Sequence, residues 1–375
     1  MSKINTATIT FHASHNYGSM LQAYALQQVL FSLGVVNEII NLRTPIQRKF
    51  YPQPKVNFNL FSIKDIVKSI LIIPHIKSLN KKYELFESFL KYDLKLTKEY
   101  GEISPDLLNS IDKYDYLISG SDQIWNTICG DFNWAYYLPF AKGNAIAYAP
   151  SMGPHGEEQV NIDFYPIIRE YLKQYIGISV REEGTAKIIN KITGQQPQIH
   201  IDPTMLLSKE QWERKIINKP LVKGNYIFLY HPFVNKEIIL LGRKMSRLMG
   251  IPLVISNFNF RTIVHLFGCK KIYDCGPWEF LNLVKNSSLV LSGSFHAVVF
   301  SILFQKPFYA LNGDKDNRIS EILHKTNLED RVINSHNVCR VIKKAYEVDF
   351  TKSLSILEIE KRRSLEFLKK HLNII

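Results

Sequence analysis

The sequence predicts an α/β protein with two domains, each built on a parallel sheet, and three observations indicate this fold class. Short apolar segments typical of buried strands alternate with longer helical segments along most of the chain, which is the pattern of parallel sheets covered by helices. The chain has 375 residues, more than one ordinary core accommodates. Its hydrophobic content of 46% supports a large buried core and argues against global disorder.

The first series of elements extends from the N-terminus to about residue 207. A strand over residues 7–11 is followed by a loop and by a helix over 19–33, and Gly34 takes the position that glycine usually occupies after a helix. Further strands are predicted over residues 38–40, 114–119, 145–149, 176–180 and 199–201. We therefore predict an N-terminal domain of residues 1–207.

The second series begins with a strand over residues 226–230. Strands over 253–255, 289–291 and 308–311 then alternate with helices over 236–249, 277–285 and 295–305. These elements predict a C-terminal domain of residues 208–350. A last helix over 353–373, within the segment 351–375, is expected to cross back and pack on the N-terminal domain.

Residues 60–95 do not follow this alternation and predict a helical insertion in the N-terminal domain. Apolar residues follow helical spacing from Ile63 to Leu71, and lysines accompany them as far as Lys82. Two interpretations stay open. The insertion covers the sheet of the first domain, or it is a basic amphipathic element that rests on a membrane interface.

The charge balance favours anionic partners. Lysine and arginine number 47 against 34 acidic residues, a net charge of +13, which suits phosphorylated metabolites, phospholipid head groups or nucleic acid. The basic residues are spread along the chain without a long run, so we expect no nucleic-acid partner and favour small anions or lipid head groups.

Other classes lack their signatures. Four cysteines show neither metal-ligand spacing nor a disulfide framework, which predicts no metal site and a reducing, cytoplasmic location. The N-terminus lacks a signal-peptide core and no apolar run reaches transmembrane length. Motifs of nicotinamide enzymes, P-loop ATPases, zinc proteases and α/β-hydrolases do not occur.

Residues 289–308 are the most informative stretch for function. A buried strand ends in the turn Ser292–Ser294, and an apolar helix starts at Phe295. In a βαβ unit such a turn lies at the carboxyl edge of the sheet, where ligands bind, and the helix start attracts anions. His296 is the one titratable group there, so we expect it to contact a ligand. The alternative is that it only caps or packs at the turn.

Two loops of the N-terminal domain suit a sugar-like acceptor. In the first, His12, His15 and Asn16 can bind hydroxyl groups, either histidine can act as a base, and Gly18 permits close approach of the backbone. The alternative is an Asn/Gly turn with incidental histidines.

The second loop follows the strand 114–119. Ser121, Asp122 and Gln123 offer polar groups beside the ring of Trp125, and a sugar face stacks on such a ring. The alternative roles are a helix cap for Asp122 and a core position for Trp125.

Two arginines are candidate anion ligands. Arg181 directly follows a buried strand, and its planar fork pairs with carboxylate or phosphate in bidentate fashion. An ion pair with Glu182 or Glu183 is the alternative. Arg318 either adds positive charge at the cleft or pairs with neighbouring acidic residues such as Glu321.

Taken together, these loops resemble those of the polysaccharide pyruvyl transferase family. The matching stretches cover most of residues 5–331 in order, and they are FHASHNYGSMLQAYALQQVLFSLG, YDYLISGSDQIWN, IAYAPSMG, ISVREEGTAKII, IDPTMLL, LVLSGSFHAVVFSILFQKPFYAL and NRISEILHKTNLEDR. The resemblance implies two Rossmann-like domains facing a central cleft, as in GT-B glycosyltransferases, with the acceptor on the N-terminal and the donor on the C-terminal side.

The resemblance also implies an enzyme that moves the carboxyethylidene group of phosphoenolpyruvate onto two hydroxyls of a sugar in surface polysaccharide synthesis. Phosphoenolpyruvate is then a co-substrate, and no cofactor is expected. His296 would be donor ligand and acid, Arg181 would bind phosphate or carboxylate, Ser294 and Phe295 would lie against the donor, and Asp122, His12 or His15 would be the base.

One position departs from the family pattern. Many members carry Arg-x-His where this chain has Ser294-Phe295-His296, although other members share Ser-Phe-His. The expected replacements for the arginine are Arg181, which matches another donor-binding arginine of the family, and Arg318.

Two other functions stay open at this point. One is a GT-B glycosyltransferase that uses a nucleotide sugar, and the other is a non-catalytic sugar-binding protein of the same fold. An acceptor linked to a polyprenyl diphosphate would explain the positive charge. Such an acceptor would also place the enzyme peripherally at the inner face of the membrane.

Overall fold

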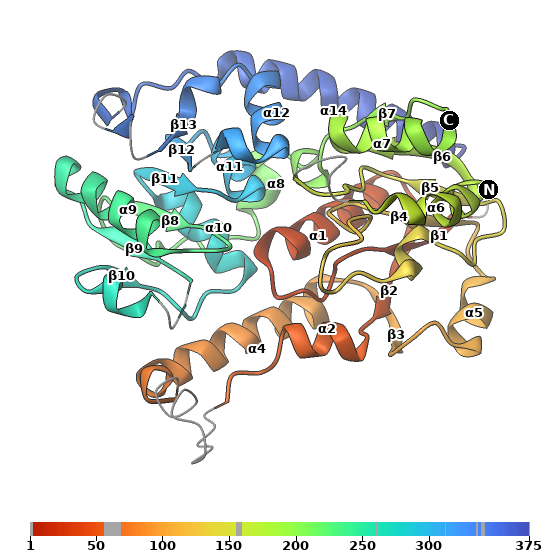
Figure 1. Ribbon diagram of the computed structural model, residues 1–375, viewed down its shortest axis with the longest axis horizontal. Helices are drawn as coiled ribbons and strands as arrows, with labels where there is room; N and C mark the ends of the chain where they lie inside the picture. The colour runs from red at the N-terminus through yellow and green to blue at the C-terminus, as the bar shows by residue number, and fades with distance from the viewer. Residues whose placement is uncertain are drawn as a thin grey trace.

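The computed structural model describes residues 3–55, 69–154, 160–257, 259, 262–311, 313–334, 337–338 and 342–374. It consists of two parallel sheets with helices packed around them (Figure 1). The predicted α/β fold class is therefore confirmed. Most of the amphipathic run predicted from Ile63 to Leu71 lies outside the described residues.

The first sheet contains the strands of the N-terminal half. All its pairings are parallel, and β1 lies between β2 and β4, where the strand order reverses. In spatial order the strands are β3 (Leu96–Tyr100), β2 (Val36–Leu42), β1 (Asn5–Ile9), β4 (Tyr116–Ser119), β5 (Ala145–Ala147), β6 (Tyr175–Val180) and β7 (Gln198–Ile199).

The second sheet repeats this arrangement with β8 at the position where the strand order reverses. Its pairings are also parallel. In spatial order the strands are β10 (Lys270–Lys271), β9 (Leu253–Ile255), β8 (Ile227–Tyr230), β11 (Leu289–Ser292), β12 (Phe308–Leu311) and β13 (Val332–Ile333). Residues 200–226 connect the two sheets, and the predicted boundary at residue 207 falls within this connection.

Helices follow the strands as the alternation predicts. Those of the first half are α1 (Tyr17–Ser32), α2 (Pro45–Phe50), α4 (Ile76–Asp93), α5 (Pro105–Ile111), α6 (Tyr165–Leu172) and α7 (Glu183–Thr193). Those of the second half are α8 (Lys209–Glu213), α9 (Lys236–Met249), α10 (Pro277–Asn286), α11 (Phe295–Leu303), α12 (Asn317–Lys325) and α14 (Thr351–His371). α1 and α11 are buried along almost their whole length, as expected for helices between two packed layers.

The two halves of the molecule share one hydrophobic core. The ring of Tyr17, at the start of α1, stacks on Phe280 of α10 with centroids 4.6 Å apart. Helix α4 also reaches both halves, because Phe89 packs on Trp278 of α10 and the indole of Trp278 donates a 2.9 Å hydrogen bond to Asp93. The described part of the insertion thus lies at the junction of the two halves (Figure 1).

Helix α14 spans from the second half to the first (Figure 1). Near its start, the Ser353 hydroxyl donates to the carbonyl of Thr326 in the second half. Near its end, Ser364 contacts His200 at 3.2 Å and the ring of Phe367 packs on the same imidazole. The final helix therefore ties the two halves together at the face opposite α4.

Candidate active site

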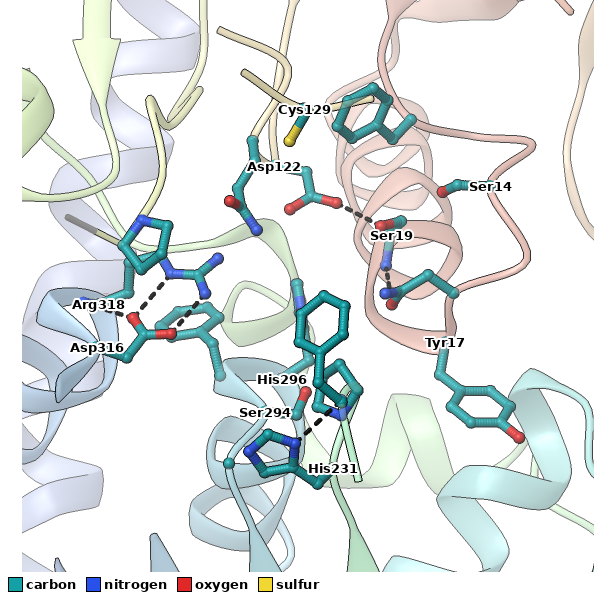
Figure 2. A pocket seen from close by; sticks show the side chains of 18 of the residues that line it. Ser14, Tyr17, Ser19, Asp122, Cys129, His231, Ser294, His296, Asp316 and Arg318 are labelled. Atoms are coloured by element: carbon teal, nitrogen blue, oxygen red, sulfur yellow. Dashed lines mark hydrogen bonds and ion pairs between the residues drawn. The ribbon is translucent and has the colours of Figure 1, made fainter. Parts of the chain in front are cut away.

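A cavity of about 890 Å³ lies between the two sheets. Its walls come from loops that follow β1, β4, β8, β11 and β12, so both halves contribute their carboxyl edges, where ligands bind in open α/β sheets. Figure 2 shows Tyr17 and Ser19 on one side, Asp316 and Arg318 on the other, and His231, Ser294 and His296 between them.

His296 lies in the first turn of α11 and faces this cavity. Ser294 is the N-cap residue, but its side chain makes no capping hydrogen bond to the helix. The first backbone N–H groups of a helix have no partner within it, so this helix start can receive an anion. Phe295 also lines the cavity and is buried.

Asp202 links His296 to Arg181. Its Oδ2 atom is 2.9 Å from Nη1 of Arg181 and 3.4 Å from Nε2 of His296. Its Oδ1 atom accepts hydrogen bonds from the backbone N–H and the hydroxyl of Thr204. Burial raises the pKa of the Asp202 carboxyl, but His296 and Arg181 outweigh burial and hold that pKa well below its usual range. The carboxylate of Asp202 therefore faces the imidazole, whose buried Nε2 atom makes no hydrogen bond within the protein.

Asp202 was not predicted as a site residue from the sequence. The sequence feature that could have identified Asp202 was its position after β7, at the same sheet edge as Arg181. The carboxylate is wholly buried, and a buried aspartate after a strand is a candidate partner for a charged group.

Asp122 lies at the centre of the cavity wall, after β4. Its Oδ2 atom accepts a 2.5 Å hydrogen bond from the hydroxyl of Ser19, and its Oδ1 atom is 3.7 Å from Nη1 of Arg181. The backbone at Asp122 has a positive φ of 74°, a conformation that aspartate tolerates better than most residues. Gln123 lines the same wall. Asp122 thus has an oxygen near the cavity and a fixed hydroxyl partner.

The loop before α1 places two predicted residues at the cavity. Asn16 accepts hydrogen bonds from the backbone N–H groups of Gly18 and Ser19, so it caps the helix as well as lining the cavity. Nε2 of His15 is 2.8 Å from Glu87 of α4, and Arg43 forms a bidentate pair with the same carboxylate. Burial opposes ionisation of Glu87, but His15 and Arg43 lower its pKa to about 2.

Three predicted side chains of the two acceptor-side loops do not line the cavity. The ring of His12 is buried and contacts the carbonyl of Thr10 and the side chain of Asn41. Ser121 is buried and donates to the carbonyl of Ala149. Trp125 occupies a core position, which was the alternative to a sugar-binding role. A side chain in the loop after a strand can turn either into the protein core or toward the sheet edge, and these three are buried in the core.

The indole of Trp125 shows why it is unavailable to a sugar. The ring is wholly buried and stacks on Tyr137 with centroids 5.0 Å apart. Its N–H is shared between the hydroxyl of Ser119 and the carbonyl of Tyr136. The ring is therefore covered by the protein, and its polar atom already has hydrogen-bond partners.

The two predicted anion-binding arginines already have carboxylate partners. Arg181 does not line the cavity; it is buried and forms ion pairs with Asp202, Glu182 and Asp122 at 2.9, 3.4 and 3.7 Å. Its guanidinium lies 4.7 Å from the ring centroid of Phe295, and Nη2 alone has no hydrogen-bond partner. Arg318 lines the cavity but makes a bidentate pair with Asp316 at 2.9 and 2.6 Å.

Two further cavity residues were not singled out as ligands. His231 follows β8 at the sheet edge, where its ring lies against Gly293 and its Nδ1 atom accepts from the backbone N–H of Phe233. Burial lowers the pKa of His231. Lys82 of α4 also reaches the cavity. His231 could have been predicted from the sequence, because it directly follows a buried strand. Lys82 could not, because the sequence does not show that α4 extends to the cavity.

Within the described ranges, the structure contains no group of three or more histidine, cysteine, aspartate or glutamate side chains arranged to hold a metal ion. None of the helices that the structure describes combines the length and the apolar character needed to cross a lipid bilayer.

Comparison with solved structures identifies the same fold in carbohydrate enzymes. A putative UDP-N-acetylglucosamine 2-epimerase from Listeria monocytogenes matches with a TM-score of 0.57 at 11% identity, covering 100% of this chain and 98% of that chain. The S. aureus protein MnaA, solved with UDP, matches with a TM-score of 0.54 at 13% identity and the same coverage. A glycosyltransferase from Rickettsia africae gives 0.51 at 12% identity, again with the same coverage. No curated protein sequence matches the chain.

Two parallel-sheet domains with a cavity between their carboxyl edges define a GT-B-like α/β protein, in agreement with these neighbours. The sequence narrows this class. The chain belongs to the polysaccharide pyruvyl transferase family, because the sequence model of that family matches residues 16–315.

Proposed function

We propose that the protein is a phosphoenolpyruvate-dependent pyruvyl transferase that forms a cyclic ketal on a sugar. The observation that carries this proposal is the arrangement at the start of α11. There, His296 faces the cavity beside an uncapped helix start, with the carboxylate of Asp202 3.4 Å behind its ring. Phosphoenolpyruvate is a small dianion or trianion, and such a site offers both hydrogen-bond donors and positive potential.

The proposed reaction proceeds in two additions at one carbon. A proton is added to the methylene carbon of phosphoenolpyruvate, which makes C2 electrophilic. One sugar hydroxyl attacks C2 and loses its proton, and the C2–O bond to phosphate then breaks and releases inorganic phosphate. A second hydroxyl attacks C2 and loses its proton, which closes the ketal. The reaction needs an acid and a base in fixed positions.

We assign these roles to residues that the structure brings to the cavity. His296 is the acid, and the carboxylate of Asp202, 3.4 Å from its Nε2 atom, orients the ring. Asp122 and His15 are the candidate bases on the acceptor side. Asn16 and Gln123 supply polar atoms for sugar hydroxyls. His12 and Trp125 have no part in this proposal because their side chains are buried elsewhere.

The acceptor we propose is a sugar of a growing bacterial surface polysaccharide, such as a capsule or exopolysaccharide. A polyprenyl-diphosphate-linked acceptor at the inner face of the cytoplasmic membrane agrees with the net charge of +13. In this proposal the enzyme acts in the cytoplasm and associates with the membrane only peripherally.

The test is a mass-spectrometric assay with phosphoenolpyruvate and a panel of galactose-, mannose- and glucose-containing lipid-linked acceptors. We expect a product heavier by one carboxyethylidene group and release of phosphate that depends on phosphoenolpyruvate. Turnover of a nucleotide sugar without phosphoenolpyruvate would show a glycosyltransferase instead.

The assigned acid is tested by His296→Ala, with His324→Ala as the matched control. His324 is an exposed histidine of the same half and is paired with Glu329. We expect His296→Ala to abolish ketal formation and His324→Ala to leave it unchanged. Full activity of His296→Ala contradicts the mechanism, and acceptor binding without turnover in the unmodified protein indicates a non-catalytic sugar-binding protein.

A further inference from the structure

The cavity has a charge imbalance that the proposed roles leave unexplained. The turn before α11 contains no cation. The guanidinium of Arg318 is held by Asp316 in a bidentate pair. That of Arg181 is surrounded by three carboxylates. Both arginines are therefore largely neutralised before any anionic ligand arrives.

Two lysines also line the cavity, and of these Lys315 is exposed to solvent whereas Lys82 is partly buried. Lys82 differs from the two arginines as well. It comes from α4, is only partly exposed, and lines the same cavity. Its ammonium nitrogen lies 4.8 Å from the ring centroid of Tyr17 and 5.9 Å from that of Phe86. Among the residues that the structure describes, no carboxylate forms an ion pair with Lys82, although lysines and arginines elsewhere in the molecule have such partners.

A partly buried ammonium without a counter-ion is costly, because burial removes water that would otherwise solvate the charge. The two aromatic faces offset part of this cost through cation–π attraction. They do not neutralise the charge. Burial accordingly lowers the pKa of Lys82. A bound anion would supply the missing partner.

The position of Lys82 connects it to His296. The ammonium lies over Tyr17, the residue before Gly18, and Gly18 touches the imidazole of His296. Tyr17 also packs on Tyr230, which precedes His231 of the cavity wall, with centroids 5.3 Å apart. Lys82 and His296 thus line the same cavity, although they come from different halves of the molecule.

We propose that Lys82 binds an anionic group of the donor, phosphate or carboxylate, and so carries the donor-binding charge of this site. This inference rests on the proposed function, because it takes phosphoenolpyruvate as the donor. Its consequence is that helix α4 completes the donor site. The donor then contacts both halves of the molecule.

The experiment compares Lys82→Met with Lys81→Met in the full-length protein. Methionine keeps the length of the side chain and removes the charge. Lys81 is an exposed neighbour on the same helix, paired with Glu84, so its variant has the same net charge. Isothermal titration with phosphoenolpyruvate should show affinity weakened at least about tenfold in Lys82→Met, because the variant loses a hydrogen bond between charged groups. Lys81→Met should bind like the unmodified protein.

Melting temperatures without ligand separate binding from folding. Lys82→Met should melt at or above the temperature of the unmodified protein, because it loses an unpaired charge. Added phosphoenolpyruvate should stabilise the unmodified protein and Lys81→Met, but hardly stabilise Lys82→Met. Lys82→Arg, which restores the charge, should recover part of the affinity.

Equal affinity of Lys82→Met and the unmodified protein for phosphoenolpyruvate overturns the inference. A different result would reject the proposed function. In that result, the unmodified protein does not bind phosphoenolpyruvate but still binds inorganic phosphate, which is titrated in parallel. If that phosphate binding is lost in Lys82→Met, Lys82 is an anion ligand but the donor is not phosphoenolpyruvate.

Discussion

The imidazole of His296 lies directly against the α-carbon of Gly18, so that the starts of α1 and α11 meet across the cavity. A methyl group placed on Gly18 would come within 2.0 Å of Nδ1 and 2.4 Å of Cγ of His296. The ring thus has Asp202 near Nε2 and Gly18 beside Nδ1. The backbone of Gly18 does not have the positive φ that favours glycine. Glycine is required here because any larger side chain would collide with the ring of His296.

We therefore predict that Gly18→Ala displaces His296 and impairs activity. The ring can avoid the new methyl group only by leaving its rotamer and its position beside Asp202. Misplacement of a reacting group by about 1 Å costs on the order of 100-fold in rate, so we expect a loss of that order in turnover with phosphoenolpyruvate. Gly101→Ala is the control, because no atom lies within 4 Å of a methyl group there.

Combining the two changes tests the cause. In the double variant Gly18→Ala/His296→Ala the clash is gone, and its melting temperature should be higher than expected from adding the effects of the single changes. Strictly additive effects in this pair, or full activity of Gly18→Ala, would contradict the role assigned to the contact.

Asp202→Asn should destabilise the protein by about 3–5 kcal/mol at pH 7, since it removes one partner from a buried ion pair. Arg181 and His296 would both lose the carboxylate that lies nearest to them. Urea unfolding measures the change. Asp112→Asn is the control. Its carboxylate pairs with Lys142 on the surface, where such pairs contribute about 0–1 kcal/mol.

The same variant predicts a pH dependence. The pKa of Asp202 is lowered in the folded protein, so its contribution is fully present above the unfolded aspartate pKa of about 3.9 and is lost as the pH falls below that value. The difference in unfolding free energy between the two proteins should therefore shrink below about pH 4. A difference that stays constant down to pH 2 would show that Asp202 contributes through packing and not through its charge.

The sequence predicted the order of strands and helices well because the buried strands and the apolar helices α1 and α11 have unambiguous patterns. It missed β3, whose residues LTKEY are mostly polar at the sheet edge, and the two-residue strands β10 and β13. Such edges are defined by their neighbours in the sheet and not by their own composition.

The site was harder to predict for a different physical reason. The sequence places loops at a sheet edge, but it does not say which side chains turn inward, as His12 and Trp125 do. It also hides partners that are far apart along the chain. The carboxylates around Arg181 include Asp122 and Asp202, and Lys82 reaches the cavity from an insertion.

The burial of Trp125 leads to a prediction that separates structure from binding. Trp125→Phe removes the N–H that Ser119 and Tyr136 share and leaves space beside Tyr137. We expect a loss of about 1–3 kcal/mol in unfolding free energy with an unchanged KM for the acceptor. Gln123 lies two residues earlier and lines the cavity. Gln123→Ala should therefore raise the KM for the acceptor and leave the unfolding free energy nearly unchanged. A raised KM in Trp125→Phe would instead support stacking of a sugar on the indole.

The ion pairs of Glu87 connect α4 to the loop before α1 and should contribute stability that depends on pH. Burial raises the pKa of this carboxyl, yet His15 and Arg43 bring it to about 2. Above the unfolded glutamate pKa of about 4.3 the carboxylate is ionised in both states and its contribution is complete. Below that pH the unfolded chain takes up the proton first, so the contribution falls until the folded carboxyl is protonated near pH 2.

Glu87→Gln should therefore lower the unfolding free energy at pH 7 by about 1–3 kcal/mol, a range that allows for partial solvent screening of this carboxylate. The difference from the unmodified protein should narrow steadily between about pH 4.3 and pH 2. Glu84→Gln, on the exposed side of α4, is the control and should change stability little at any pH. If the curves of Glu87→Gln and the unmodified protein run parallel through this range, His15 and Arg43 do not stabilise the ionised carboxylate, and Glu87 cannot be what holds His15 at the cavity wall.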